Sequence, residues 1–150
     1  MPIPPILDLM TTTTPPQTGP DVLAQFIPQS PFVAKLGIVA ERLDGVEIRL
    51  RMPWDESNVT VGDMVHGGAI AALADVAVMA AAWAQTEMPE SLRGVTTSMS
   101  MQFLAPARGT DLVALGRVLR RGRTLVNCEV DVVTPGGDAV AKAIATYKVG

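Results

Sequence analysis

The feature that most constrains the fold is an alanine-rich apolar run of sixteen residues, Ala69 to Ala84. Apolar residues in this run cover every face of a helix, so the helix is expected to be buried all round. Its many alanines let neighbouring backbone approach closely, as an antiparallel sheet does when it curls around a helix. The run is also shorter than the roughly 20 residues that a membrane-spanning helix needs. The expected fold is therefore α+β, with a sheet wrapped around one long helix from about Gly68 to Ala84.

Alternation of apolar and polar residues with period two predicts strands on both sides of this helix. Val46 to Met52 alternates apolar with charged residues, and Asp44-Gly45 predicts a tight turn from a preceding strand. Four more strands are expected after the helix, and we expect them to form a meander of successive neighbours. Their ranges are Val95–Leu104, Asp111–Arg120, Thr124–Thr134 and Ala139–Val149, and the turn signals between the last three are Arg121-Gly122 and Pro135-Gly136-Gly137.

The N-terminal region differs in composition from the rest of the chain. Residues 1–20 contain six prolines and five threonines, a composition typical of a disordered tail. Residues 21–150 are expected to form a single domain. It would begin with a short helix over Asp21 to Ile27, capped by Asp21 and ending before Pro28. The tail has neither a basic start nor a small-residue cleavage site, so we expect a soluble, cytoplasmic protein.

Composition excludes several classes of function. The one cysteine, Cys128, cannot form a disulfide within the chain and favours a reducing compartment. The one histidine, His66, excludes metal sites built from several histidines. A net charge of -3 gives no general reason to bind nucleic acid or a membrane. Because 48% of its residues are hydrophobic, the chain is expected to bury surface against another copy of itself.

Asp75 is the only charged residue in the apolar helix. A buried, unpaired carboxylate is costly, so Asp75 is expected to be paired, protonated or functional. A structural alternative is a carboxylate bonded to a backbone group or paired with an arginine such as Arg49 or Arg51. At the start of the helix, the backbone N–H groups of Gly67 and Gly68 would lie where the helix dipole is positive and could hold an oxyanion. The alternative is that the glycine pair merely forms a tight turn.

The spacing of His66 and Asp75 bears on the assembly. Nine residues at about 100° each give about 900°, so their side chains would point to opposite sides of one helix, about 13 Å apart. One subunit cannot easily bring the two side chains into one site. If both act together, two-fold symmetry must place Asp75 of one chain near His66 and Gly67 of another. A homodimer, or a tetramer built from two dimers, is therefore expected.

The segment from Val65 to Asp75 resembles the hallmark segment of the hotdog-fold acyl-CoA thioesterases of the phenylacetate-degradation and 4-hydroxybenzoyl-CoA type. The resemblance extends over about Pro31 to Val149. Further matching positions are Phe32, Leu36-Gly37-Ile38, Val95-Thr96, Phe103-Leu104-Ala105-Pro106-Ala107 and Arg120-Arg121-Gly122-Arg123.

This resemblance implies hydrolysis of an acyl-CoA thioester to a carboxylic acid and free coenzyme A. The Gly67 N–H would bind the thioester carbonyl oxygen, and Asp75 of the partner subunit would act as nucleophile or general base. Thr96 would lie near the attacking water, and His66 would form a hydrogen bond rather than act as the base. No metal or redox cofactor is expected, since a thiolate with a pKa of roughly 8 to 9 leaves readily.

The chain departs from the family pattern just before His66. The family usually carries Asn six residues and Gly three residues before this histidine, but Thr60 and Asp63 occupy these places. Either Thr60 or the displaced Asn58 could orient water or the substrate. The departure also leaves a second possibility, a non-catalytic hotdog protein that binds or senses acyl-CoA.

Arginines are concentrated in the second half of the chain. Between Ser91 and Arg123 there are six arginines and one acid, Asp111. Arginine side chains suit the phosphates of coenzyme A, although a solvated hairpin would have the same composition. We expect Asn58 and Gly68 to contact the substrate, with coenzyme A contacts from one or more of Arg120, Arg121 and Arg123. The sequence leaves the acyl group open among aryl, short-chain and long-chain.

Overall fold

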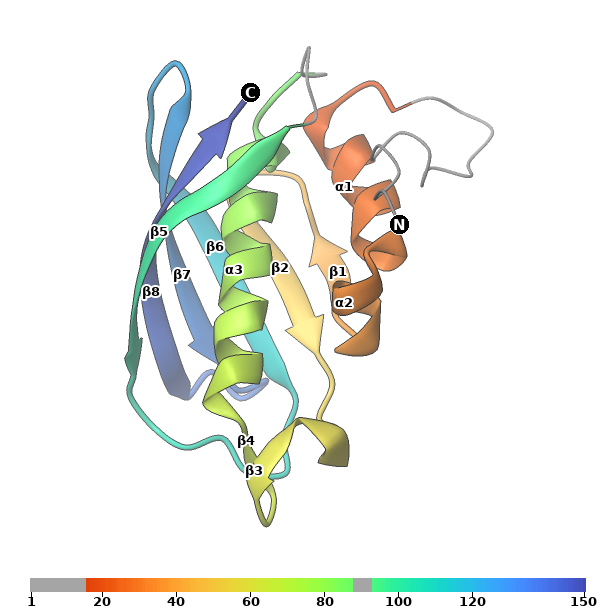
Figure 1. Ribbon diagram of the computed structural model, residues 1–150, viewed down its shortest axis with the longest axis vertical. Coiled ribbons are helices and arrows are strands. Elements are labelled where there is room, and N and C mark those ends of the chain that lie inside the picture. The colour runs from red at the N-terminus through yellow and green to blue at the C-terminus, as the bar shows by residue number, and fades with distance from the viewer. Residues whose placement is uncertain (1–15, 88–92) are drawn as a thin grey trace, which may run out of the picture.

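The computed structural model describes residues 16–87 and 93–150 and contains a six-stranded antiparallel sheet that curls around one long helix, α3 (Gly67–Ala84) (Figure 1). The strands follow one another across the sheet in the order β1-β2-β6-β7-β8-β5. Their bounds are β1 Val39–Arg42, β2 Glu47–Met52, β5 Gly94–Phe103, β6 Leu112–Arg121, β7 Leu125–Val133 and β8 Ala139–Val149. The predicted α+β fold and all five strand ranges are confirmed to within two residues, but the order of the strands is not.

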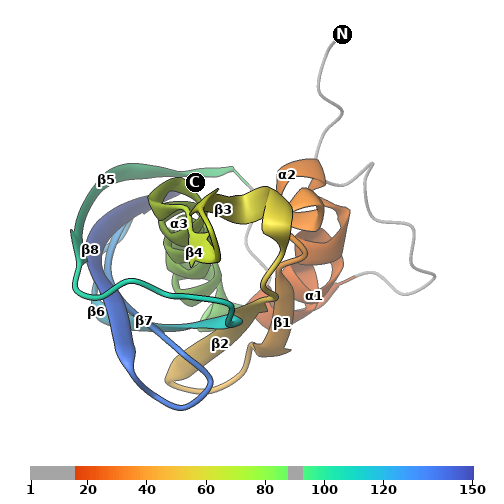
Figure 2. The same cartoon turned by 90° about the horizontal axis from the view of Figure 1, so that it is seen from below.

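The predicted four-strand meander is wrong for its first strand. β6, β7 and β8 are successive neighbours, but β5 crosses the end of the sheet and pairs with β8 at the opposite edge. Viewed along α3, the sheet curls around the helix from β2 to β5, while α1 (Gly19–Gln29) and α2 (Pro31–Lys35) lie on the side near β1 (Figure 2). This crossing places β5 across α3, beside the carboxylate that the sequence singles out.

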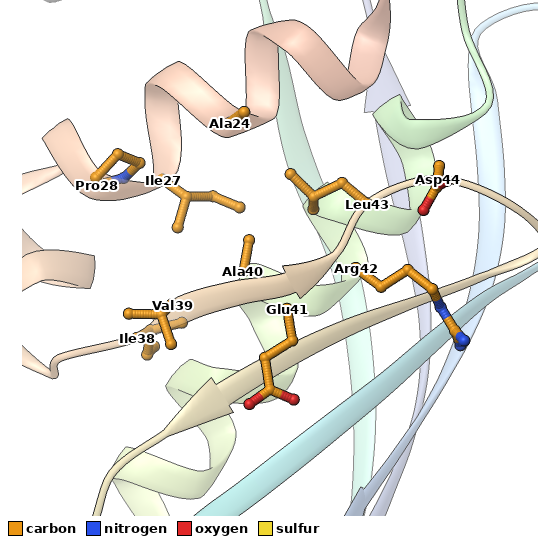
Figure 3. Close-up of a pocket in the computed structure, with 10 residues that line it drawn as sticks. All are labelled: Ala24, Ile27, Pro28, Ile38, Val39, Ala40, Glu41, Arg42, Leu43 and Asp44. Atoms are coloured by element: carbon orange, nitrogen blue, oxygen red, sulfur yellow. The ribbon is translucent and has the colours of Figure 1, made fainter.

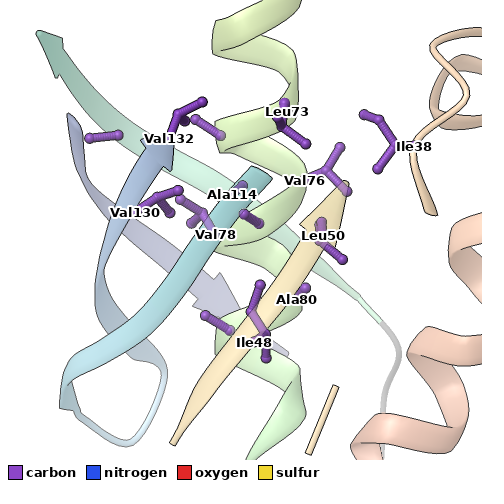
Figure 4. Packing of buried hydrophobic residues seen from close by; sticks show 14 of the residues in the cluster. Ile38, Ile48, Leu50, Leu73, Val76, Val78, Ala80, Ala114, Val130 and Val132 are labelled. Atoms are coloured by element: carbon purple, nitrogen blue, oxygen red, sulfur yellow. The ribbon is translucent and has the colours of Figure 1, made fainter. Parts of the chain in front are cut away.

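The concave face of the sheet and α3 form the hydrophobic core. Ile48 and Leu50 of β2 and Val130 and Val132 of β7 gather against α3 (Figure 4). Alternate residues of these strands face the helix, as the period-two pattern predicted. By length and hydropathy alone α3 could span a membrane. However, 67% of that apolar window is buried within the fold, as is typical of a core helix.

One stripe of α3 is not covered by the chain itself. The stripe, called the open stripe below, consists of Gly67, Gly68, Ala71, Ala72, Asp75 and Met79. Gly68 and Asp75 are exposed and the other four residues are half-buried. The expectation that the helix is buried all round, with a buried carboxylate at Asp75, is therefore wrong for the single chain. Glycine, alanine and methionine are apolar whether they face a sheet or the solvent, so the sequence does not show that this stripe is uncovered.

The first helix begins earlier and ends later than predicted. Thr18, not Asp21, is the N-cap of α1, and Asp21 completes a capping box at the third helical position. Pro28 lies inside the helix, in its last turn, rather than after its end. The folded region therefore includes part of the predicted tail, since α1 begins at Gly19. Residues 1–15 of that tail lie outside the described residues.

The convex face of the sheet carries a network of ion pairs. Arg117 contacts Glu47, Glu129 and Asp131, and Lys142 of β8 contacts the last two. Hydrogen bonds to Asp131 and then to Glu129 raise the pKa of Lys142. This face of the sheet is polar at its centre, although Ile144 of β8 is 47% exposed. Further uncovered apolar surface lies on the open stripe and along β5.

Candidate active site

The N-terminus of α3 holds the predicted oxyanion site. His66 is the N-cap, and its Nδ1 accepts a hydrogen bond of 2.8 Å from the Gly68 N–H. A Cβ on Gly68 would lie 2.9 Å from this nitrogen, so only glycine leaves room for the ring. The Gly67 N–H has no acceptor among the described residues. The two glycine amides therefore differ, because the histidine occupies one and the other is free to bind a ligand.

A short hairpin positions His66. It consists of β3 (Val59–Val61) and β4 (Met64–Val65), which follow a single 3-10 turn over Glu56–Asn58. The His66 N–H donates to the Asn58 carbonyl oxygen over 2.8 Å, so these two residues lie opposite each other. The pairing skips Thr60, which is exposed in an irregular part of β3. Of the two candidates for the missing family asparagine, Asn58 is therefore the one whose backbone contacts His66.

Asp63 occupies the place of the family glycine and anchors this hairpin. Its carboxylate pairs with Arg108 over 3.0 Å, and its carbonyl oxygen accepts a hydrogen bond of 3.2 Å from the Trp54 indole N–H. Its carbonyl oxygen also accepts a bond from the Gly109 N–H. These contacts tie the hairpin to the segment between β5 and β6. Both the carboxylate and the carbonyl oxygen of Asp63 therefore have partners within the fold.

Asp75 lies two turns into α3, on the open stripe. Its Oδ1 accepts a hydrogen bond of 2.7 Å from the Thr96 hydroxyl of β5. The alternative of an ion pair with Arg49 or Arg51 is wrong, because both arginines bind Glu41 of β1. The structure therefore joins two of the predicted site residues directly, and the carboxylate remains accessible to a ligand.

A β-bulge in β5 makes this contact possible. Thr96 is opposite Tyr147 of β8 and Ser98 is opposite Thr146, so Thr97 is an extra residue in the pairing. The Thr97 hydroxyl donates to the Thr146 carbonyl oxygen over 3.1 Å. Strict alternation would place Thr96 on the outward side with Ser98. The bulge shifts the alternation by one residue, so that Thr96 faces α3.

A cavity of about 370 Å³ opens beside Asp75 and Thr96, and α1, α2, α3, β5 and β8 contribute to its walls. Tyr147 lines it, and the Tyr147 hydroxyl accepts a hydrogen bond of 3.1 Å from the Trp83 indole. Burial raises the pKa of Tyr147, with the nearby Asp75 charge acting in the same direction, so the phenol stays neutral. Sequence reasoning placed Tyr147 in a strand but gave no sign that β8 would carry it into this cavity.

A separate cleft of about 410 Å³ lies between α1 and β1 (Figure 3). Ile27 and Pro28 of α1 face Val39 and Ala40 across it. It contains none of the predicted site residues. In the part of the chain that the structure describes, no group of three His, Cys, Asp or Glu side chains could hold a metal ion.

The arginines expected to bind coenzyme A lie on the β6–β7 hairpin, at the C-terminal end of α3. Arg121 donates a hydrogen bond to the Ala82 carbonyl oxygen in the last turn of the helix. Arg120 and Arg123 are exposed and have no partner within residues 16–87 and 93–150. The helix has 18 residues. At a rise of about 1.5 Å for each residue, its length is about 27 Å. One chain therefore places these arginines at the opposite end of the helix from Gly67.

The fold and the helix-start site define the hotdog class of proteins, as the resemblance implied. A family model described as the thioesterase superfamily matches residues 62–141, which include His66, Gly67, Asp75 and Thr96. The chain belongs to the thioesterase superfamily. The recognised resemblance is confirmed at this level.

Three comparisons illustrate the similarity. A protein of Halobacterium salinarum that bears the name of an esterase is 32% identical over 124 residues, 81% of this chain and 82% of the relative. The medium/long-chain acyl-CoA thioesterase YigI of Salmonella typhimurium is 28% identical over 140 residues, 83% of this chain and 89% of the relative. The PaaI protein of E. coli, from the phenylacetic acid degradation operon, has the same fold, with a TM-score of 0.67. It is 23% identical, over 77% of this chain and 86% of that protein.

Proposed function

We propose that this protein is an acyl-CoA thioesterase that acts as a homodimer, with each active site built from both subunits. One observation carries the proposal. The open stripe of α3 presents both an unoccupied amide, at Gly67, and an accessible carboxylate, at Asp75, held by the Thr96 hydroxyl. The name of the YigI relative supports acyl-CoA as the substrate class.

The geometry suits hydrolysis of a thioester. The Gly67 N–H, at the positive end of α3, would bind the carbonyl oxygen and stabilise its charge as the tetrahedral intermediate forms. Asp75 would either activate a water molecule or attack the carbonyl carbon itself. The Thr96 hydrogen bond occupies one oxygen of the carboxylate and directs the other. Coenzyme A then leaves as a thiolate, so neither a metal nor a redox cofactor is required.

His66 has a supporting role in this mechanism. Its Nδ1 accepts the Gly68 N–H, so in the neutral ring the proton is on Nε2. The ring then has no free lone pair with which to remove a proton from water. We assign His66 the role of orienting the start of α3, so that the Gly67 N–H points outward. We propose Asn58, whose carbonyl oxygen accepts the His66 N–H, as the residue that orients water or substrate there.

A site that uses both Gly67 and Asp75 requires two copies of the chain. The two residues are eight positions apart, about 12 Å along the helix, so one thioester cannot reach both in a single subunit. Two open stripes that cross antiparallel, with Ala71 at the two-fold axis, place Asp75 of each chain beside Gly67 of the other. The small Ala71 and Ala72 side chains permit that close approach.

The edge strand β5 supports the same assembly. It is ten residues long, ends the sheet, and exposes Val95 and Phe103 by 56% and 55%. A long edge with exposed apolar residues favours pairing with another strand. Antiparallel pairing of two β5 strands would join the sheets of two subunits and bring the open stripes together. Two such dimers could form a tetramer.

The same arrangement suggests how the arginines of the β6–β7 hairpin could contact coenzyme A. With Ala71 at the two-fold axis, the C-terminal half of one α3 extends past the start of the other and ends about 13 Å beyond the partner's Gly67. Arg120 and Arg123 of the subunit that supplies Asp75 would then lie beyond the partner's Gly67, at a distance from the thioester where phosphates of coenzyme A could bind. Arg121 is already bonded to Ala82, so we propose the other two. The lone reduced cysteine, Cys128, fits a cytoplasmic location.

Non-catalytic acyl-CoA binding is the second candidate, favoured by the exposed Thr60 at the place of the family asparagine. It predicts thermal stabilisation by acyl-CoA without release of thiol. Turnover by the wild-type protein would exclude it.

The test is thiol release from a panel of acyl-CoAs. We expect Asp75→Asn to lower kcat by about 10²- to 10⁴-fold, because the variant loses the base or nucleophile but keeps the shape. Thr96→Ala should lower kcat less, and Thr96→Ser should restore it because the hydroxyl returns. Thermal unfolding and circular dichroism serve as controls for folding. If Asp75→Asn retained most of the activity, the proposed mechanism would be wrong.

A further inference from the structure

The cavity beside Asp75 continues into a second, smaller chamber. The outer chamber, of about 370 Å³, includes Asp75 and Thr96 in its lining. The inner chamber, of about 110 Å³, extends to Trp83 and to Val22 of α1. Four residues line both chambers and so mark the passage between them: Phe26, Met79, Gly94 and Tyr147.

The two chambers follow one face of α3. Asp75, Met79 and Trp83 are four residues apart in turn, so their side chains lie nearly above one another. The distance from Asp75 to Trp83 along the helix is about 12 Å. A chain attached to a carbonyl at Asp75 would therefore pass Met79 before it reached the indole of Trp83.

The walls of the inner chamber are apolar. Val22, Leu23 and Phe26 form its α1 side. Trp83 lines only the inner chamber, and its indole N–H donates to the Tyr147 hydroxyl at the passage; the two rings pack edge to face, with centroids 6.3 Å apart. Gly94 completes the passage, because a Cβ there would lie 2.5 Å from the Tyr147 hydroxyl. The lining suits hydrocarbon.

The size of the inner chamber distinguishes between acyl groups. An apolar cavity of about 150 Å³ is large enough to hold benzene. The inner chamber, at about 110 Å³, is smaller than that cavity, so it gives a rigid six-membered ring less room than the outer chamber does. A straight methylene chain is narrow enough to pass, and the flexible Met79 side chain can adjust around it.

We propose that the inner chamber binds the tail of a straight-chain fatty acyl group, and that Met79 and Val22 set how far this tail can enter. This inference rests on the proposed function, since it takes the thioester carbonyl to lie at Asp75. It assigns the protein to aliphatic acyl chains that extend beyond Met79, rather than to aryl groups.

Two substitutions from different elements test this proposal. Met79→Phe narrows the passage from α3, and Val22→Phe fills the inner chamber from α1. Each should lower kcat/KM for decanoyl-CoA by about 10- to 200-fold, the range for loss of fit in an apolar pocket. Butanoyl-CoA, which ends in the outer chamber, should change by about twofold or less. Ala24→Phe is the matched control, because Ala24 is an exposed α1 residue that lines neither chamber.

A binding measurement separates this inference from the proposed function. In Asp75→Asn protein, decanoyl-CoA should raise Tm more than butanoyl-CoA does, and adding Met79→Phe should abolish the difference. This result without any thiol release from wild type would support the chamber but overturn the proposed function. Hydrolysis with an unchanged chain-length profile in both chamber variants would overturn the chamber alone. A wild-type preference for phenylacetyl-CoA over decanoyl-CoA would also overturn it.

Discussion

Of the two neighbouring backbone amides at the start of α3, one has an acceptor among the described residues and the other has none. The two amides therefore have different roles in the proposed site. The Gly68 N–H bonds to the imidazole of His66, so the first turn is capped and the ring is fixed in one tautomer. The Gly67 N–H is left for a ligand. The one histidine of the chain is therefore the N-cap of α3.

The free amide can be removed without breaking the helix. Gly67 is the first helical residue, where proline is well tolerated. His66 is in the extended region, which suits a residue before proline. Gly67→Pro should therefore lower kcat by about 10²- to 10³-fold through loss of one oxyanion donor. Gly67→Ala keeps the N–H, and its Cβ would lie 3.5 Å from the Phe103 ring, an ordinary contact. Equal activity of the two variants would contradict the assignment.

Cys128 determines whether a thiol-release assay is free of background. It is fully buried, and burial raises its pKa to about 11. At about pH 8 only about one thiol in a thousand would then be ionised, compared with about a quarter for a free thiol. We expect no reaction of native protein with an aromatic disulfide reagent and one thiol per chain after denaturation. Rapid labelling of the native protein would show that this core opens.

At the level of elements, α1 is held by an N-terminal cap and also forms one wall of the inner chamber. The Thr18 hydroxyl accepts the Asp21 N–H, and Asp21 accepts in return. Thr18→Ala should therefore cost about 1 kcal/mol and lower Tm by about 2 to 4 °C. Thr124→Ala removes an exposed hydroxyl that makes no hydrogen bond with the described residues and should change Tm little. Similar Tm values for the two variants would contradict a structural role for the cap.

The same cap makes α1 sensitive to acid. Hydrogen bonds from the Thr18 hydroxyl and from the Gln17 N–H lower the pKa of Asp21. Because the folded pKa lies below the unfolded value of about 3.9, this contribution is present above that pH and is lost as the pH falls through the folded pKa.

The strands and α3 could be predicted from the sequence because each has a regular period and a clear end. Val46–Met52 and Ala139–Val149 were found to within one residue in this way. The β3–β4 hairpin and α2 were missed, since two to five residues are too few to show a period. The place of β5 beside β8 was missed for another reason. It depends on long-range pairing, which local alternation does not encode.

The candidate site was predictable in its residues but not in its contacts. Asp75 stood out as a lone charge in an apolar helix, and Gly67 as part of a glycine pair at the helix start. Thr96 came from the family resemblance, and nothing in the sequence indicated its hydrogen bond to Asp75. The exposure of Asp75 was also hidden, because an all-apolar helix does not show which face is left for a second chain.

At the level of the whole molecule, the uncovered surfaces and the incomplete site coincide. The open stripe of α3 and the β5 edge lie on neighbouring elements that Thr96 and Asp75 connect. In the proposed dimer, each chain would carry one half of two different sites. Burial of these surfaces in a dimer would therefore bring the two halves of the proposed active site together and cover the apolar edge of β5 at the same time.

This arrangement predicts complementation between two inactive variants. In a heterodimer of Asp75→Ala and Gly67→Pro chains, one site carries both substitutions and the other carries neither. Random assembly makes half of the dimers mixed, so a co-expressed pair should show about a quarter of wild-type activity. The measurement is thiol release by the co-purified mixture carrying two different tags. The separately purified variants are the controls, and a mixture as inactive as they are would place the site within one chain.

The bulge at Thr97 also determines which face of β5 the residues before it occupy. Because side chains alternate with a period of two, one extra residue inverts the phase of everything on one side of it. Deletion of Thr97 would leave Thr96 next to Ser98 in a regular strand, still opposite Tyr147 and still facing α3. Regular pairing of Thr97 itself with Tyr147 would instead turn Thr96 away from Asp75. A comparison of related sequences by residue identity alone would miss such a loss, since every proposed catalytic residue would still be present. The irregular pairing at Thr97 is therefore as much a part of the site as the residues themselves.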